Sequence, residues 1–334
     1  MIASLKPLPN LKPSLASLAS ILRPQLNEVN ACILEKMQSP VSLIPQIAGY
    51  LVSLGGKRLR PLLTVAAAEL CGYKGKRHIY LAACIEFIHT ATLLHDDVVD
   101  ESSLRRGMDT ANALWSNKAS VLVGDFLFSR AFELMVQDGS LDILRILSEA
   151  SSTIAEGEVL QLASSHDLSL SEETYLKIIG SKTARLFTAA TEVGAIVAGA
   201  EDKKRKALSH FGYALGMAFQ LIDDVLDYAA DQEKLGKTIG DDFREGKVTF
   251  PIIVAYKQGT DQEFWEEAFH NGIRDNNALT HAIRLLKESG ALLKTKHKAE
   301  FFIEEALECL AIFPSSPLKT ALEDLAYFSL YREA

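Results

Sequence analysis

One acidic motif that occurs twice has the clearest capacity for chemistry in this sequence. Asp-Asp-x-x-Asp covers residues 96–100 (DDVVD) and residues 223–227 (DDVLD), and each copy follows an apolar run with helical spacing. Residues four apart share one face of a helix, so the first and last carboxylates of each copy lie about 6 Å apart. All-oxygen sites with few ligands per ion suit Mg²⁺, which keeps its waters and bridges to substrate phosphates.

The repetition of the motif makes it informative. A single copy is explained equally well as an exposed, acidic helix end. By chance, one copy arises in about one chain of this length in twenty-five, and two copies in fewer than about one in a thousand. The two copies therefore predict two acidic clusters that bind metal.

Basic residues occur where a phosphate partner would need them. The segment 55–61 reads GGKRLRP, Arg105 and Arg106 follow the first motif, and three lysines occur at positions 182, 237 and 247. Arginine forks onto phosphate oxygens, and lysine adds a mobile point charge. Taken singly, these are explained as a loop before a helix or as exposed charges. Together with the acidic clusters they predict a site for a diphosphate ester.

The elements that must position these residues are predicted to be helices. Apolar residues recur at spacings of three and four over 122–135 and 215–226, whereas alternation with period two is rare. Turn-forming residues separate such runs at 72–75, 138–140 and 315–317, and Ser171 is typical of a helix start. We predict an all-α fold of about ten or more helices in a single large domain, because no linker or change in composition divides the chain.

Composition and charge exclude several classes of protein. The chain has 334 residues, of which 48% are hydrophobic and 23% charged, with a net charge of -8. This balance is that of a globular protein, and the negative charge disfavours nucleic acid as a partner. The basic run 203–206 is explained as a solvated helix start.

The cysteines and the hydropathy of the chain indicate where the protein is located in the cell. The four cysteines lie far apart and form no C-x-x-C pair, which favours a reducing cytoplasm. No apolar run reaches the roughly 18 residues that span a bilayer. Residues 1–25 contain four prolines and no acidic residue, and we expect an irregular N-terminal arm there, followed by one domain over 26–334.

The motifs, taken in order, resemble those of the trans-isoprenyl diphosphate synthases. The resemblance runs from about residue 30 to the C-terminus, and it is closest to the long-chain subgroup that makes octaprenyl diphosphate for quinone side chains. The matching segments are 55–61, 86–100 (EFIHTATLLHDDVVD), 105–107, 123–126, 157–158, 182–184, 219–227 (FQLIDDVLD) and 236–242.

This resemblance implies a polyprenyl synthetase fold, in which helices surround a central cavity, and Mg²⁺-dependent condensation of isopentenyl diphosphate onto an allylic diphosphate such as farnesyl or geranyl diphosphate. It also implies a homodimer and a product that can be passed to the membrane. It implies the following metal ligands: Asp96, Asp100, Asp223 and Asp227, supported by Asp97 and Asp224. Residues for isopentenyl diphosphate are Lys57, Arg60, His89 and Arg106. Residues for the allylic diphosphate are Arg105, Lys182, Thr183, Gln220, Lys237 and Lys247.

Product length is predicted from residues near the first motif. Ala91 lies five residues before Asp96, about 7.5 Å along the helix axis. Short-chain members of the family have bulky aromatic residues at this level, so the alanine implies an open cavity for a long chain. We assign the floor of the cavity to the helix that carries Phe128, Phe132 and Met135, although periodicity alone explains all these residues as ordinary core.

Other interpretations of the residues remain. A lone histidine such as His89 on an apolar helix face is more often a core residue. The chain could be a medium-chain synthase, making products from geranylgeranyl to heptaprenyl or solanesyl diphosphate, or a non-catalytic regulatory subunit. A terpene cyclase shares the ionisation chemistry but does not need the basic cluster at Lys57, Arg60 and Arg106.

Overall fold

The computed structural model describes residues 15–53, 56–105, 107–229 and 239–332, and these residues are almost entirely helical. The first half contains α1 (Leu15–Ile21), α2 (Arg23–Lys36), α3 (Leu43–Ser53), α4 (Leu59–Leu70), α5 (Arg77–Val99), α6 (Ala111–Leu114), α7 (Asn117–Asp138) and α8 (Leu141–Ala163). The second half contains α9 (Glu172–Ile179), the π-helix η1 (Gly180–Ala184), α10 (Arg185–Val197), α11 (Asp202–Ala229), α13 (Asp241–Glu245), α14 (Phe250–Lys257), α15 (Gln262–His270), α16 (Asn276–Glu288), α17 (Ala291–Leu310) and α18 (Pro317–Tyr331). The predicted all-α fold is confirmed.

A short hairpin contains the only strands among the described residues. Strands β1 (Leu104–Arg105) and β2 (Met108–Asp109) pair antiparallel directly after α5. Gly107 has φ +75°, a conformation that glycine adopts without a steric penalty. The hairpin reverses the chain at the end of the helix that carries the first motif.

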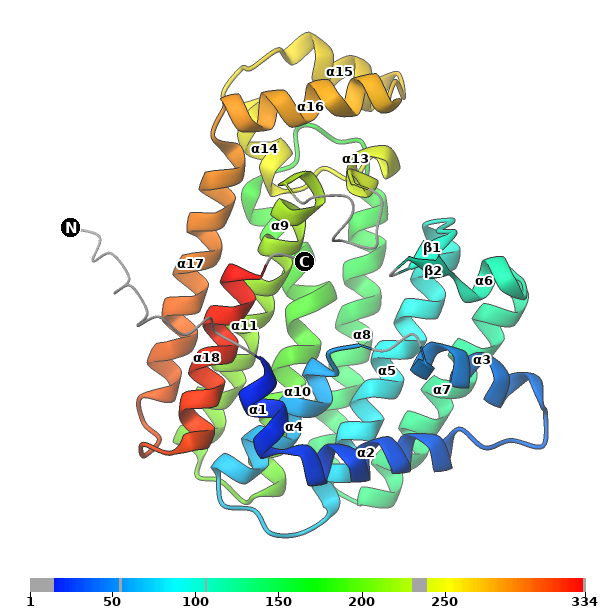
Figure 1. Ribbon diagram of the computed structural model, residues 1–334, viewed down its shortest axis with the longest axis vertical. Coiled ribbons are helices and arrows are strands. Elements are labelled where there is room, and N and C mark those ends of the chain that lie inside the picture. Colours follow the sequence, from blue (N-terminus) through cyan, green and yellow to red (C-terminus); the bar gives the residue numbers. More distant parts are fainter. Residues whose placement is uncertain (1–14, 54–55, 106, 230–238, 333–334) are drawn as a thin grey trace.

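The long helices form one bundle. Figure 1 shows α5, α7, α8, α10 and α11 side by side, with α2 across one end and α15 and α16 at the other. Helices α5 and α7 run antiparallel, because the Ser120 hydroxyl donates to the Leu94 carbonyl at one end and Arg77 pairs with Asp138 at the other. None of the described helices is both long and apolar enough to cross a membrane.

Helix boundaries follow local signals in the sequence. Helix α7 ends at Asp138 because Gly139 adopts φ +75°, and the Ser140 hydroxyl then caps α8 by accepting from the Ile143 amide. Ser171 caps α9 in the same way. The turn signals predicted at these positions are therefore confirmed.

The N-terminal arm requires a correction. Residues 1–14 lie outside the described residues, but α1 and the start of α2 are helical within the segment expected to be irregular. The boundary at residue 25 falls inside α2. Leu18 and Leu22 are fully buried, and α1 packs on α18, so burial of these leucines determines the structure here.

Close helix packing predicts a sensitive glycine in α10. A Cβ atom on Gly194 would lie 2.5 Å from the Thr64 carbonyl oxygen of α4. We expect Gly194→Ala to lower the free energy of unfolding by about 1–3 kcal/mol, because neither backbone can yield easily. Gly49→Ala in α3 is the matched control, since its Cβ would meet nothing within 4 Å. Denaturant unfolding measures both, and equal stability of the two variants would contradict the packing argument.

Candidate active site

The first acidic motif lies at the C-terminal end of α5, where the chain turns into the hairpin. Asp96 and Asp97 are in the last turn, and Asp100 is the C-cap residue. Burial is the largest cause that raises the pKa of Asp96 to about 7, and the charges of Glu158 and Asp100 raise it further, against the opposing effect of Lys182. The motif therefore concentrates more negative charge than a buried site tolerates without cations.

Cations hold the other two carboxylates of this motif. Asp97 is buried, and its Oδ1 accepts from Arg105 Nε at 2.9 Å and Nη2 at 2.6 Å. Lys247, between α13 and α14, lies 2.9 Å from Asp100 Oδ2 and 2.6 Å from Glu245, and these carboxylates raise its pKa despite the opposing effect of burial. Arg105 and Lys247 thus bind the acidic motif itself.

The second motif lies in the last turns of α11. Asp224 is fully buried and accepts from the Tyr175 hydroxyl and from Gln220 Nε2, the latter at 3.0 Å. Gln220 Oε1 in turn accepts from the Thr183 hydroxyl at 2.8 Å. Burial and the charge of Asp242 raise the pKa of Asp224 well above its usual range.

Asp227 contacts the first residues of α13. Its carboxylate accepts from the backbone amides of Asp241 at 3.3 Å and Asp242 at 3.2 Å. Burial, then the charges of Asp242 and Asp241, raise the pKa of Asp227 well above its usual range. Asp227 therefore anchors the start of α13.

The π-helix η1 connects the two motifs. Lys182 contributes to the electrostatics of Asp96, and the next residue, Thr183, binds Gln220 beside Asp224. Two α8 residues that sequence reasoning left without a role hold Lys182, since its Nζ donates to Glu158 at 2.8 Å and to Gln161 at 2.9 Å. π-Helical turns occur frequently at functional sites.

A glycine in α8 permits this approach. A Cβ atom on Gly157 would lie 2.8 Å from Ser181 Cβ and 3.0 Å from the Lys182 amide nitrogen. The Gly157-Glu158 pair is therefore the sequence signal for the contact between α8 and η1. The glycine allows η1 to pack closely, and the neighbouring carboxylate binds Lys182.

Arg60 and His89 lie together, as a shared role requires. Arg60 Nη1 lies 3.0 Å from His89 Nε2, which must accept, because arginine only donates. The Arg60 guanidinium also lies 4.6 Å from the centre of the Phe187 ring. Burial lowers the pKa of Arg60 to about 10, against the charges of Glu86 and Asp223, so this arginine stays charged at neutral pH.

Of the remaining predicted basic residues, Lys57 is described by the structure, whereas Arg106 and Lys237 are not. Lys57 is exposed, with its Nζ 5.0 Å from the centre of the Phe328 ring of α18. Sequence reasoning also missed Arg332, which pairs with Asp223 at 2.5 Å.

The predicted chain-length residues lie in different environments. Ala91 and Met135 are fully buried between α5 and α7, and the antiparallel contacts place Met135 about 16 Å below Ala91 along the helix axis. Phe132 is 43% exposed, on the outer face of α7. The structure therefore does not give Phe132 the buried position that a floor requires within one protomer. Helical spacing alone does not determine which side chains a neighbouring helix covers.

No three histidine, cysteine or acidic side chains among the described residues converge closely enough to hold a metal ion alone. The donor set nevertheless consists of carboxylates with raised pKa values, which suits a hard cation that completes its shell with water and phosphate oxygens. The residues present therefore fit Mg²⁺ when it is shared with a bound diphosphate.

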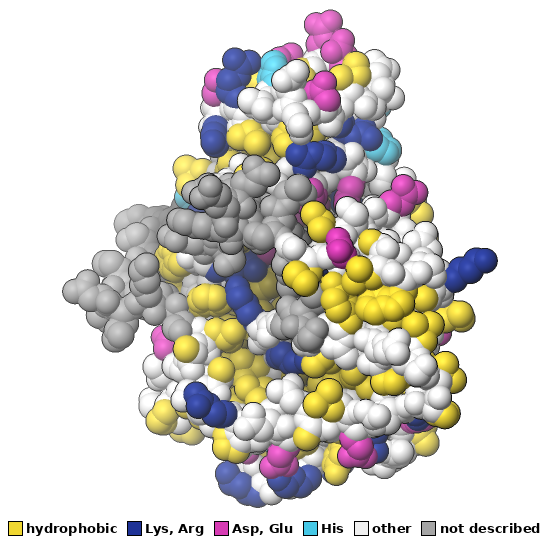
Figure 2. Space-filling view, turned by 45° about the vertical axis from the view of Figure 1, so that its right-hand side comes forward, with side chains coloured by type: hydrophobic (Ala, Val, Ile, Leu, Met, Phe, Trp, Pro, Cys, Tyr) yellow, Lys and Arg dark blue, Asp and Glu magenta, His cyan; other side chains and the backbone are white. Residues whose placement is uncertain are grey.

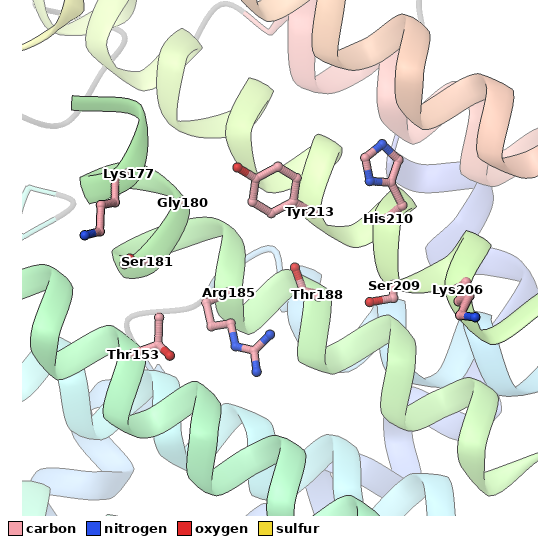
Figure 3. A pocket seen from close by; sticks show the side chains of 10 residues that line it. All are labelled: Thr153, Lys177, Gly180, Ser181, Arg185, Thr188, Lys206, Ser209, His210 and Tyr213. Atoms are coloured by element: carbon pink, nitrogen blue, oxygen red, sulfur yellow. The ribbon is translucent and has the colours of Figure 1, made fainter. Parts of the chain in front are cut away.

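A pocket of about 560 Å³ is separate from this site. Figure 3 shows its lining side chains, which come from α8, α9, η1, α10 and α11 and include Lys177, Arg185 and Lys206. None of the motif aspartates lines it. The pocket borders η1 but does not belong to the candidate active site.

Comparisons with known proteins identify the class. The family model for polyprenyl synthetase matches residues 41–286. The chain belongs to this family and has its all-helical isoprenoid synthase fold. It is a prenyltransferase that elongates all-trans prenyl chains.

Individual relatives are similar over nearly their whole length. The octaprenyl diphosphate synthase of Escherichia coli is 48% identical over 308 residues, which are 91% of this chain and 95% of that protein. The all-trans-nonaprenyl-diphosphate synthase (geranyl-diphosphate specific) of Rhodobacter capsulatus is 45% identical, with 89% and 92% covered. A polyprenyl synthase from Caulobacter crescentus, crystallised with calcium and isoprenyl diphosphate, has a TM-score of 0.94 and 50% identity, with 98% and 100% covered.

The raised pKa of Asp96 predicts a dependence of stability on pH. A carboxyl group whose pKa is higher in the folded chain than in the unfolded one destabilises the fold as it ionises, so stability falls as pH rises from about 4 to 7. In chelator at pH 8, Asp96→Asn should therefore be more stable than wild type by about 1–3 kcal/mol. The difference should shrink towards pH 4.

Denaturant unfolding at several pH values measures this difference. Asp142→Asn, at an exposed position of α8, is the control and should follow wild type. If the difference in free energy of unfolding between Asp96→Asn and wild type stayed constant from pH 4 to pH 8, ionisation of Asp96 would not be its cause.

Proposed function

We propose that this chain is a Mg²⁺-dependent octaprenyl diphosphate synthase, which condenses isopentenyl diphosphate onto an allylic primer such as farnesyl diphosphate and supplies the side chain of respiratory quinones. The observation that carries the proposal is the link through η1: the charge of Lys182 acts on Asp96, and Thr183 donates to Gln220, which donates to Asp224. One short element thus reaches both acidic motifs. The octaprenyl diphosphate synthases among the relatives support this product over shorter or longer ones.

We assign the metal to the four motif carboxylates that are only partly buried. Asp96 and Asp100 from α5, with Asp223 and Asp227 from α11, would bind Mg²⁺, while Asp97 and Asp224 support them from buried positions. Bound Mg²⁺ would neutralise the diphosphate of the allylic substrate as it departs.

We assign two groups of basic and polar residues to the two substrates. Arg105, Lys182, Thr183, Gln220 and Lys247, with Lys237, would bind the allylic diphosphate. Lys57, Arg60 and His89, with Arg106, would bind isopentenyl diphosphate. The contact of Arg60 with His89, and the effect of the Lys182 charge on Asp96, support these groups.

The reaction then follows from charge. The C–O bond of the allylic substrate breaks with its electron pair on the diphosphate, whose charge Lys182 and Arg105 help to neutralise. The isopentenyl double bond attacks the resulting allylic cation and forms a new C–C bond. The adduct loses a proton to the released diphosphate, which leaves an allylic product five carbons longer. Apolar residues such as Ala91 and Ile88, both buried, exclude water from the cation.

We expect turnover to depend on both acidic motifs. Asp96→Ala and Asp223→Ala should each reduce condensation by at least about a hundredfold, because ionisation requires a neutralised diphosphate. Incorporation of labelled isopentenyl diphosphate into product measures turnover, and circular dichroism checks the fold. Asp142→Ala is the control on the same bundle. Near-normal activity in either motif variant, with a normal fold, would exclude that aspartate from the metal site.

Chain length is proposed to be limited along the α5–α7 interface. Ala91→Phe should yield products of about 15 to 20 carbons, because a phenyl ring about 7.5 Å below Asp96 would block the path. Met135→Ala should yield products longer than those of wild type. Chromatography of the dephosphorylated products measures both. An unchanged distribution in Ala91→Phe would reject this direction for the cavity.

We also propose that the enzyme is a homodimer through the outer faces of α7 and α8. Large exposed hydrophobic residues concentrate there: Leu122, Phe132, Val136, Leu141, Val159 and Leu162. Figure 2 shows hydrophobic side chains gathered in a broad area on the side of the molecule that it brings forward. Such patches mark protein interfaces. In a dimer, Phe132 would be covered, and only then would it contribute to chain length.

The proposed location is the cytoplasm, from which the product would be passed to the membrane. The four cysteines are free, and Cys32 and Cys84 are buried, which suits a reducing compartment.

A further inference from the structure

The last residue that the structure describes reaches the candidate metal site. Helix α18 ends at Tyr331, and Arg332 then adopts an extended conformation with φ -63° and ψ 141°. The Arg332 side chain is only 6% exposed. A long, charged side chain is rarely buried without a specific partner.

The partner of Arg332 is the first aspartate of the second motif. Arg332 Nη2 donates to Asp223 Oδ1 at 2.5 Å and to the Phe219 carbonyl at 2.9 Å. The guanidinium carbon lies 3.8 Å from the centre of the Phe219 ring. Arg332 thus neutralises Asp223 and packs on the Phe219 ring. These contacts connect the end of α18 to α11.

This ion pair differs from those of the other motif carboxylates. Arg105 and Lys247, which hold Asp97 and Asp100, lie within the chain between ordered elements on both sides. Arg332 lies directly after the last residue of α18, in an extended conformation. Its Nε is buried without a hydrogen-bond partner among the described residues. An unsatisfied buried donor makes the buried position of this guanidinium less favourable in free energy.

The carboxylate of Asp223 remains accessible. Its side chain is 42% exposed, so a cation from solvent can approach it. A divalent ion on this carboxylate would lie within a few ångströms of the guanidinium, where like charges repel. Arginine cannot relieve this repulsion by losing a proton, because its pKa is too high. It can do so only by moving away.

We propose that Arg332 is a positioning residue that neutralises Asp223 before metal binds and withdraws from it when metal binds. The affinity of the second motif for metal is then set by competition with the C-terminal arginine. This inference rests on the assignment of Asp223 to the metal site in the proposed function. It adds a residue that no motif in the sequence indicates.

The experiment measures metal affinity directly, without substrate. Mn²⁺ serves as the probe, because it takes the same oxygen ligands as Mg²⁺ and free Mn²⁺ is quantified by electron paramagnetic resonance. The full-length proteins compared are wild type, Arg332→Gln, Arg332→Lys, Asp223→Asn and the double variant Asp223→Asn/Arg332→Gln. Arg284→Gln on α16 is the control for loss of one positive charge, since Arg284 is 62% exposed.

We expect Arg332→Gln to bind Mn²⁺ about three- to tenfold more tightly than wild type, because a competing charge is removed. Arg332→Lys should stay close to wild type, since it keeps the charge. In the Asp223→Asn background the substitution of Arg332 should have no effect, because the competition acts through Asp223. A merely structural role predicts the opposite sign, since a loosened site binds metal more weakly.

Unchanged or weaker Mn²⁺ binding by Arg332→Gln would overturn the inference. If wild type then still condensed isopentenyl diphosphate in Mg²⁺, the proposed function would stand and only the role of Arg332 would fall. Wild-type metal affinity in Asp223→Asn would remove both the metal assignment of Asp223 and this inference. Tighter binding by Arg284→Gln, equal to that of Arg332→Gln, would reduce the effect to net charge and also reject the inference.

Discussion

Electrostatic repulsion among carboxylates is the constraint on which the rest of this structure depends. Six aspartates from two motifs lie at the ends of α5 and α11, and burial raises the pKa of Asp96, Asp224 and Asp227. Gathering such groups is unfavourable unless cations or hydrogen-bond donors accompany each one. The fold brings these partners from distant segments of the chain. A site built in this way binds a polyanion only together with further positive charge, which is the property that a diphosphate-ionising enzyme needs.

The helix bundle meets this constraint through short, specialised segments. The π-helix η1 directs Lys182 and Thr183 towards different motifs, and Gly157 allows α8 to approach it closely. The hairpin after α5 returns Arg105 to Asp97. Long regular helices thus supply rigidity and a dry apolar interior, whereas their irregular ends supply the charged groups. In the proposed function, this division would keep the diphosphates at one end and the growing apolar chain along the α5–α7 interface.

The C-terminal helix connects the proposed binding groups for the two substrates. Phe328 lies against Lys57, and Arg332 pairs with Asp223, so one end of α18 contacts residues assigned to isopentenyl diphosphate and to metal. Helix α18 in turn packs on α1, whose Leu18 is fully buried. The first and last described helices therefore support the active site jointly.

The sequence by itself determined the helical class, the helix ends at Gly139 and Ser171, and the two aspartate motifs, because periodicity, capping and motif spacing are local properties. Only the tertiary structure decided which groups partner the motifs. Arg332 lies 109 residues from Asp223, and no local pattern marks that contact. The exposed position of Phe132 could likewise not be predicted from the sequence. Helical periodicity does not determine which neighbouring element covers each face of a helix. Residues far apart in the chain become partners only when helix packing fixes their distance, and packing depends on all the helices at once.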